Sequence, residues 1–547
     1  MKFRTLMIYL GAILVTVVLL FGVRAVQNNL DAQVKTHRLR YAGSIKNAPP
    51  LVVFTTVALG SFRGIIADML WLRAQSLQNK HQYYEMVQLA QWITDLQPGF
   101  SGATRYLAWN MAYNISVTCS SPIERWYWVN EGIKLLRDKA LEYNPDDPAI
   151  YNELAWIYLH KLGNVMDDAN IYYKNRLAVE MQKVFGEEPD WERMAYAPVG
   201  REQFLREYPA GDPLWSGIPG SDPDEKYDNL YSAFKRSAPE RPKDFENVDA
   251  KVLAYLRAEL LRERYKLDSR KIFAINKKYG TLDWRTPEAQ AIYWATESIE
   301  ATRRNGGQRD INVDRNVNEA LKQSFYAGRV MKTDPDLDKW SGIIYFTFPN
   351  LSLVDAVFRV YTDSQTYHDG TGEKTSSFRT ARINFLKEAI YLLYAYGAYS
   401  KADEYYKRLS DDEPQERVID GHTVKYGKND LEKFVKAEWV DTIKSANARQ
   451  AEAFLVGLMY TSFISKLNGD NEKAVKYRDA ILYIYDFYVK TIGTNRRMEL
   501  PPLDFLALSV SSLLSEKQQK RLSAILEAEQ KEREEELRRN RANAPAK

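Results

Sequence analysis

Apolar residues recur at intervals of three and four from about residue 51 to residue 185, and again beyond residue 247. This spacing places them on one face of an α-helix. Short breaks of Gly, Pro, Asn and Asp separate the helical stretches. No convincing run alternates apolar and polar residues as a β-strand would. The pattern therefore predicts an all-α fold.

The predicted helices come in pairs, and the clearest pair spans residues 386–414. Apolar residues follow the helical period on both sides of Gly397, which marks the turn. Ala402 lies on the inner face of the second helix, where its small methyl group allows close packing, and Pro414 ends the pair. The same arrangement fits residues 70–98 and 151–173 and, more loosely, residues 469–489.

These pairs resemble the tetratricopeptide repeat, a helix-turn-helix unit of about 34 residues with small residues at the helix crossing and a terminal proline. Looser copies lie in residues 101–143, 285–332 and 447–489. The resemblance implies an α-solenoid of such repeats with irregular insertions. It also implies a non-enzymatic scaffold that binds an extended peptide or a partner helix along its first helices.

A longer resemblance covers residues 58–180, which include "LGSFRGIIADMLWLRAQSLQNK" and "GIKLLRDKALEYNPDDPAIYNELAWIYLHKLG". This stretch looks like a group of membrane-anchored bacterial repeat proteins. The resemblance implies a fold and an anchor, and it brings no catalytic residue with it.

Exposed positions on the first helices supply the candidate partner-binding residues. Amide groups can hydrogen-bond a peptide backbone, and aromatic rings supply rigid contact area at low entropic cost. The alternative is that some of these side chains pack against neighbouring helices. The candidates are Trp71, Gln75 and Asn79 in one pair, Asn152, Trp156 and His160 in a second, and Asn384, Lys387, Tyr391 and Tyr394 in a third.

The segment from Leu6 to Val23 has 18 residues and no charge, enough to cross most of a hydrocarbon core as a helix. No small-residue cleavage site follows it, so we expect an uncleaved anchor. The basic residues on its two sides nearly balance. The basic head favours a single-pass protein of the bacterial inner membrane with its bulk in the periplasm, and a cytoplasmic bulk is the alternative. We expect its partner to be a protein or peptide within an envelope transport, secretion or assembly complex.

Breaks in the helical pattern divide the chain. Residues 186–246 are rich in Pro, Gly and Asp, and we expect an irregular excursion packed on the repeats or a docking loop anchored by Trp215. Charges at helical spacing after residue 515 predict a solvated terminal helix, with coiled-coil binding as the alternative. The predicted segments are 1–25 (membrane anchor), 26–50 (juxtamembrane stem), 51–185 (N-terminal repeats), 186–246 (insertion), 247–514 (C-terminal repeats) and 515–547 (charged helix and tail).

Composition and motifs argue against most chemistry. Lys and Arg number 76 against 72 Asp and Glu, and this near balance disfavours a nucleic-acid partner. Cys119 is the only cysteine, so no disulfide or cysteine-based zinc site forms within one chain. Residues 368–377 lack P-loop spacing, and residues 334–345 lack the glycine and glutamate of a calcium loop. We expect no cofactor, metal or catalytic residue; a helical-toroid enzyme acting on glycans through two carboxylates is the alternative.

Overall fold

The structure is a computed structural model that describes residues 2–36, 62–96, 99–186, 188–237, 248–339, 343–371, 376–412, 415–419, 422–435, 438, 448–492 and 499–542. The chain divides into two compact units. The first unit contains Met1–Leu107, Lys134–Ile150 and Ser298–Gln308, and the second contains Ala108–Ile133, Tyr151–Glu297 and Arg309–Lys547.

Helices make up most of the described chain, which confirms the predicted all-α class. In chain order the α-helices are α1 (Lys2–Thr36), α3 (Phe62–Asn79), α4 (Tyr83–Leu96), α5 (Ser101–Trp109), α6 (Pro122–Lys134), α7 (Leu141–Tyr143), α8 (Pro148–Trp156), α9 (Asn170–Phe185), α10 (Trp191–Tyr196), α11 (Gly200–Glu207), α12 (Pro223–Ser237), α13 (Ala250–Tyr265), α14 (Ser269–Tyr279), α15 (Pro287–Arg304), α16 (Ile311–Ala327), α17 (Val354–Gly370), α18 (Ser376–Ala395), α19 (Tyr399–Asp412), α21 (Ala448–Leu467), α22 (Asn471–Ile492), α23 (Leu503–Ser511) and α24 (Glu516–Ala542).

Three of these helices continue directly into π-helical turns, and short 3₁₀ turns occur elsewhere. The π-helical turns are η1 (Asn110–Ile115), η3 (Leu135–Ala140) and η4 (Ile157–Leu162). The 3₁₀ turns are η2 (Ser116–Thr118), η5 (Pro213–Trp215) and η7 (Leu351–Leu353). Because π-helical turns are rare and often lie at functional sites, η1 and η4 indicate a candidate functional region.

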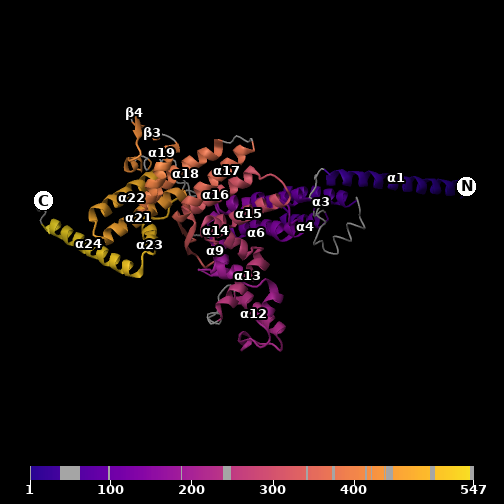
Figure 1. Ribbon diagram of the computed structural model, residues 1–547, viewed down its shortest axis with the longest axis horizontal. Helices are drawn as coiled ribbons and strands as arrows, with labels where there is room; N and C mark the ends of the chain where they lie inside the picture. The colour runs from indigo at the N-terminus through magenta and orange to yellow at the C-terminus, as the bar shows by residue number, and fades with distance from the viewer. Residues whose placement is uncertain are drawn as a thin grey trace. The chain divides into compact units, whose positions relative to one another are not determined.

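The first unit contains the helix pair α3–α4, which confirms the pairing predicted over residues 70–98 as far as it is described (Figure 1). The small residues Ala74 of α3 and Ala90 of α4 are buried, as the predicted close packing requires. The turn between the helices places His81 at a φ of 58°, a left-handed conformation that is uncommon outside glycine. Pro98, the predicted end of this pair, lies outside the described residues.

The helix α1 runs unbroken from Lys2 to Thr36, so it passes the predicted boundary between anchor and stem at residue 25 without ending. Large apolar side chains on it, including Leu14, Val18 and Phe21, are exposed. Within the described residues, we find no helix of sufficient length and apolar character to cross a membrane. The rest of the predicted stem, residues 37–50, is not among the described residues.

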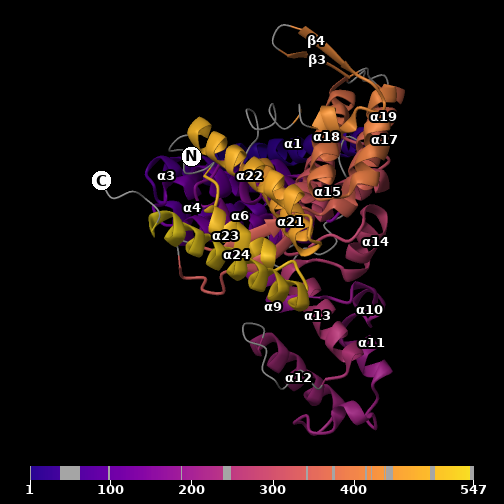
Figure 2. The same cartoon turned by 90° about the vertical axis from the view of Figure 1, so that its left-hand side faces the viewer.

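The second unit contains the pairs α18–α19 and α21–α22, which lie side by side in both views (Figures 1 and 2). Gly397 and Gly469 make the two turns with φ values of 77° and 82°, a conformation that costs other residues energy. Ala402 is fully buried, as predicted for the helix crossing. Gly457 of α21 packs so tightly that a Cβ there would lie 2.5 Å from the ring of Tyr396.

The described part of the segment 186–246 contains α10, α11, η5 and α12, so it is more regular than its composition suggests. Trp215 is buried, and its indole N–H donates to the carbonyl oxygens of Tyr208 and Pro209 at 3.1 Å. The Trp215 ring therefore packs inside this segment, and the alternative of a docking loop that it anchors stays a prediction. α10 packs on α13 and α14, where the hydroxyl of Ser269 donates to the carbonyl oxygen of Met194 at 2.8 Å. This packing agrees with an excursion that lies on the helical body.

The helical pattern gave no sign of strands, yet the described chain contains two antiparallel hairpins. They are β1 (Arg329–Thr333) with β2 (Tyr345–Phe348), and β3 (Gln415–Ile419) with β4 (His422–Tyr426). The segment after β1 is fixed to α9, because Asn175 donates to the carbonyl oxygen of Asp334 at 2.8 Å and accepts from its N–H at 2.7 Å. This attachment agrees with the packing of β2 beside α9.

Candidate functional site

Trp156 lies where α8 passes into η4, and 39% of its surface is exposed. Its indole stacks on the imidazole of His160, with centroids 4.5 Å apart and planes at 10°. From η1, the Tyr113 hydroxyl lies 3.3 Å from Nδ1 of His160. Trp109 stacks on Tyr113 at 5.5 Å. These four rings, which we call the aromatic row, offer flat surfaces held in place by two helices.

The titratable rings of the aromatic row are neutral at pH 7. Burial lowers the pKa of His160, and the nearby charge of Lys161 lowers it further. Burial raises the pKa of Tyr113, with a further contribution from Glu153. The row therefore offers apolar contact area and a few hydrogen-bonding atoms rather than charge.

The aromatic row borders a cavity of about 380 Å³, which we call the Trp156 pocket. Glu319, Lys322 and Gln323 of α16 contribute to its lining, together with Gln450 of α21. The ammonium of Lys322 lies 2.8 Å from the carboxylate of Glu319, which also accepts from Gln323 at 2.7 Å. Because this ion pair balances its own charge and amides remain, the pocket suits a polar, uncharged group such as a peptide bond. Among the described residues, it is lined by Trp156, Leu159, His160, Gly163, Asn164, Val165, Glu319, Lys322, Gln323 and Gln450.

A buried carboxyl lies close to this polar wall. Glu388 of α18 accepts hydrogen bonds from Tyr326 and Gln450. Burial raises the pKa of Glu388 to about 7, and the carboxylates of Glu319 and Glu438 add to the effect against the opposing influence of Lys322. The protonation state of the Glu388 carboxyl therefore changes near neutral pH, close to Lys322 and Gln450 of the Trp156 pocket.

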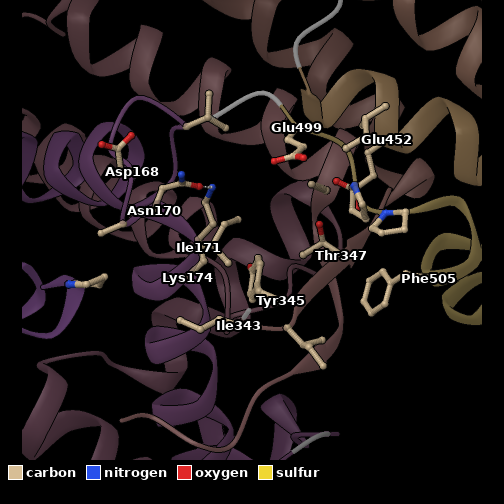
Figure 3. A pocket seen from close by; sticks show the side chains of 18 of the residues that line it. Asp168, Asn170, Ile171, Lys174, Ile343, Tyr345, Thr347, Glu452, Glu499 and Phe505 are labelled. Atoms are coloured by element: carbon tan, nitrogen blue, oxygen red, sulfur yellow. Dashed lines mark hydrogen bonds between the residues drawn. The ribbon is translucent and has the colours of Figure 1, made fainter. Parts of the chain in front are cut away.

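A larger cavity of about 1070 Å³, which we call the Lys174 cavity, lies in the same unit and shares Val165 with the Trp156 pocket. Figure 3 shows Asp168, Ile171 and Lys174 on one side of this cavity, with Glu499 and Phe505 on the other. The described residues that line it are Ser120, Pro122, Arg125, Val165, Asp168, Ala169, Asn170, Ile171, Lys174, Glu288, Ala327, Ile343, Ile344, Tyr345, Thr347, Glu452, Tyr485, Glu499, Leu500, Pro501, Pro502 and Phe505.

A buried ion network holds the loop of residues 163–169, which contributes residues to the lining of both cavities. Asp167 accepts from the ammonium of Lys161 at 2.5 Å, from the guanidinium of Arg125 at 3.2 Å and from the N–H of Ala169 at 2.8 Å. Burial opposes ionisation of Asp167, but these three partners outweigh it and lower its pKa. The loop from η4 to α9 is thus held by a charged side chain satisfied on several sides.

The predicted binding residues fall into separate regions. Trp156 and His160 line the Trp156 pocket, whereas Asn152 accepts from the amide of Asn316 at 2.8 Å. Tyr391 is only 1% exposed and packs edge to face against Phe454, so its assignment as a binding residue is wrong. The first helix of a pair carries core residues on most of its faces once other helices surround it.

The other candidates lie outside both cavities. Asn384 is exposed, whereas Lys387 and Tyr394 are half-buried, and the Tyr394 ring packs on Tyr399 with centroids 4.8 Å apart. The remaining three belong to the first unit: Trp71 is half-buried, its ring 5.1 Å from that of Tyr106, and Gln75 and Asn79 are exposed. A binding role for these exposed and half-buried residues stays a prediction.

Sequence reasoning missed the residues of the Lys174 cavity that come from outside the repeats. They come from β2 with the residues just before it, such as Ile344 and Tyr345, and from α23 with the segment before it, such as Phe505 and Glu499. Neither segment has a repeat pattern, and the two meet only in the folded unit, although they lie far apart in the chain. The only available signal was negative, since these segments interrupt the helical period.

The stretches that resemble a calcium loop and a P-loop show no ligand-binding geometry in their described residues. Asp334 of the calcium-like stretch lies 2.8 Å from the ammonium of Lys339, whose hydrogen bond lowers the Asp334 pKa. In the P-loop-like stretch, residues 368–370 form the end of α17 and residue 371 follows it. Residues 372–375 lie outside the described part of the chain. Among the residues that the structure describes, no group of three or more His, Cys, Asp or Glu could hold a metal ion.

Residues 138–168 match the family profile of the tetratricopeptide repeat. The chain thus contains a tetratricopeptide repeat in this segment, which confirms the resemblance there. The matched residues include Trp156, His160 and the buried Lys161–Asp167 pair. No curated protein and no solved structure matches the chain.

Proposed function

We propose that this protein is a non-enzymatic, membrane-anchored scaffold whose repeat helices bind an extended segment of a partner protein. The exposed stack of Trp156 on His160, inside the matched repeat and at the edge of a pocket, carries the proposal. A half-exposed indole held by a neighbouring ring has little conformational freedom left to lose on binding. Rings of this kind often dominate the energy of protein interfaces.

The amide groups around the stack indicate how a segment would bind. Gln323 and Gln450 line the same pocket as Trp156, and their amide groups, which also bond Glu319 and Glu388, are of the kind that pairs with peptide bonds. The aromatic row would cover apolar side chains of the same segment. Repeat folds generally serve as interaction scaffolds, which agrees with this arrangement.

Photo-crosslinking from the pocket tests the binding role. A photoreactive amino acid replacing Gln323 in the full-length protein should crosslink a defined partner in intact cells. Adding Trp156→Ala should lower the yield about tenfold or more, because a buried aromatic hot spot contributes about 2 kcal/mol. Trp92→Ala is the matched control, since Trp92 is also exposed but lies on α4 in the first unit. Equal yields with and without Trp156 would contradict the proposal.

The proposal includes a membrane anchor at Leu6 to Val23, with the helical body in the periplasm as part of an envelope transport, secretion or assembly complex. The uncharged sequence and the exposed apolar side chains of α1 support the anchor. Alkaline washing should leave the full-length protein in the membrane pellet, whereas Leu14→Lys with Val18→Lys should release it. In spheroplasts, external protease should remove a tag placed after Lys547, and protection of that tag would favour the cytoplasmic orientation.

The alternative is a helical-toroid glycan hydrolase. It would require two carboxylates that flank a sugar bond about 5 to 10 Å apart. Turnover of soluble oligosaccharides by the purified protein would replace the scaffold proposal.

A further inference from the structure

Glu388 of α18 is hydrogen-bonded to a residue that lines the Trp156 pocket. Its carboxyl accepts from the hydroxyl of Tyr326 on α16 and from the amide of Gln450 on α21. Since Gln450 belongs to the lining, one hydrogen bond separates this carboxyl from the surface where a partner would bind. Inside a protein, where the effective dielectric constant is low, a change in the charge of Glu388 acts over this short distance.

The cluster around Glu388 sets one ammonium group against three carboxyl groups. Lys322 favours the ionised form of Glu388, but its ammonium lies 2.8 Å from Glu319 and is therefore shared with a second carboxylate. Glu319 and Glu438 both disfavour ionisation of Glu388. The titratable and charged groups around Glu388 are Glu319, Lys322 and Tyr326 of α16, Glu438, and Tyr361 of α17, whose ring lies 6.3 Å from that of Phe385 on α18.

Glu388 changes its charge near neutral pH. Burial, the largest effect, and the neighbouring carboxylates raise its pKa to about 7. Burial also raises the pKa of Tyr361 and of Tyr113 in the aromatic row, and it lowers the pKa of His160. As pH rises through 7, Glu388 therefore gains a negative charge while these three rings stay neutral.

Two physical effects connect this charge to binding in the Trp156 pocket. A partner segment in the pocket would displace water from Lys322 and Gln450, and loss of nearby water penalises an ionised carboxyl more than a neutral one. The hydrogen bond from Gln450 to Glu388 is also stronger when Glu388 is ionised, and a more tightly held amide pairs less readily with a peptide bond. Both effects make binding tighter when Glu388 is protonated.

We infer that protonation of Glu388 controls binding at the Trp156 pocket, so that the protein holds its partner below neutral pH and releases it above neutral pH. The inference rests on the proposed function and adds the regulation of the same site. By linkage, a partner that binds the protonated form more tightly also raises the pKa of Glu388. A rise of about one in this pKa on binding corresponds to an affinity about tenfold lower at high pH than at low pH.

Crosslinking from position 323 at two pH values tests the inference. Membranes that contain the full-length protein, with a photoreactive amino acid in place of Gln323, are equilibrated at about pH 6 or about pH 8.5 before irradiation. The yield of crosslinked partner should be about 5- to 10-fold lower at the higher pH. Glu388→Gln mimics the protonated carboxyl, so its yield should be equally high at both pH values. The control Glu472→Gln removes an exposed carboxylate of α22 and should keep the pH dependence.

A second variant tests the same group through the midpoint of the pH profile. Lys322→Gln removes the cation that favours ionised Glu388, so the midpoint should move to higher pH. An unmoved midpoint would overturn the inference, even where Glu388→Gln fails to fold.

The outcomes separate this inference from the proposed function. Equal crosslinking at the two pH values would overturn the inference and leave the scaffold proposal standing. A pH dependence that persists in Glu388→Gln would also overturn it, because another group, such as His160, would then be responsible. Absence of crosslinking at both pH values would contradict the proposed function and this inference with it.

Discussion

Replacing Gly132 by alanine tests whether close helix packing stabilises the second unit. Gly132 lies in α6, where a Cβ would be 2.7 Å from the carbonyl oxygen of Ala108 and 3.6 Å from the nitrogen of Ala112. An ordinary contact begins at 3.4 Å, so the backbones would have to separate by about 0.7 Å, the difference between 3.4 and 2.7 Å. Helix packing transmits such a displacement to neighbouring side chains.

Two effects of this substitution oppose each other. Alanine is better than glycine inside a helix by about 1 kcal/mol. Overpacking a close contact costs about 1 to 3 kcal/mol, and here the obstacle is a backbone carbonyl that has no alternative rotamer. We therefore take the upper part of that range, about 2 to 3 kcal/mol, and expect Gly132→Ala to lower the free energy of unfolding by about 1 to 2 kcal/mol.

Urea unfolding of the full-length protein, followed by tryptophan fluorescence, measures this change. The control is Gly370→Ala at the end of α17 in the same unit, where nothing lies within 4 Å of the added methyl group. The control should be neutral or slightly stabilising. If Gly132→Ala is as stable as the control, helix propensity dominates and the reasoning from close packing fails.

Three further predictions concern buried residues. Tyr391→Ala should lower the free energy of unfolding by about 3 to 5 kcal/mol, as expected for a buried ring. Trp156 is exposed, so Trp156→Ala should change this free energy by less than about 1 kcal/mol. Equal effects of the two substitutions in urea unfolding would contradict the assignment of Tyr391 to the core and Trp156 to the surface. Folding raises the pKa of Glu388 from 4.5 to about 7. The stability contributed by the protonated Glu388 carboxyl is therefore fully present below pH 4.5 and is lost as pH rises toward 7. Glu388→Gln should flatten the pH profile of the melting temperature between these pH values, and an unchanged profile would refute this role of Glu388. Lys161→Ala should lower the free energy of unfolding by about 3 to 5 kcal/mol, because it leaves the buried Asp167 with Arg125 as its remaining ionic partner. Lys476 is exposed, and Lys476→Ala is the control. Equal losses for the two variants in urea unfolding would contradict the prediction.

The helix pairs were predictable because their signals are local. The period of apolar residues, a glycine at the turn and a small residue at the crossing all lie within one pair, as Gly397 and Ala402 illustrate. Tyr391 shows the limit of such reasoning. Its position on a first helix is given by the sequence, but its burial depends on Phe454, which lies 63 positions further along the chain.

The candidate site was predictable only in part. Trp156 and His160 were found because their spacing places them together on one helix, where they do stack. The pocket beside them was not, since Lys322 and Gln450 come from helices that reach it only in the folded unit. The hairpin β1–β2 was not predicted for another reason. Its strands have five and four residues, too few to show a clear alternation of apolar and polar side chains.

The two cavities draw on different parts of the chain, and this difference bears on where specificity lies. The Trp156 pocket is lined by helices and by the end of the matched repeat, features that any repeat protein can offer to a peptide backbone. The Lys174 cavity adds the approach to β2 and the segment before α23, which follow no repeat pattern. Since a repeated surface recognises features that its ligands share, discrimination between partners must come from the groups that are not repeated. On the proposed scaffold function, Ile344→Ala should therefore change the relative affinities of different partners, whereas Trp156→Ala should weaken all partners alike.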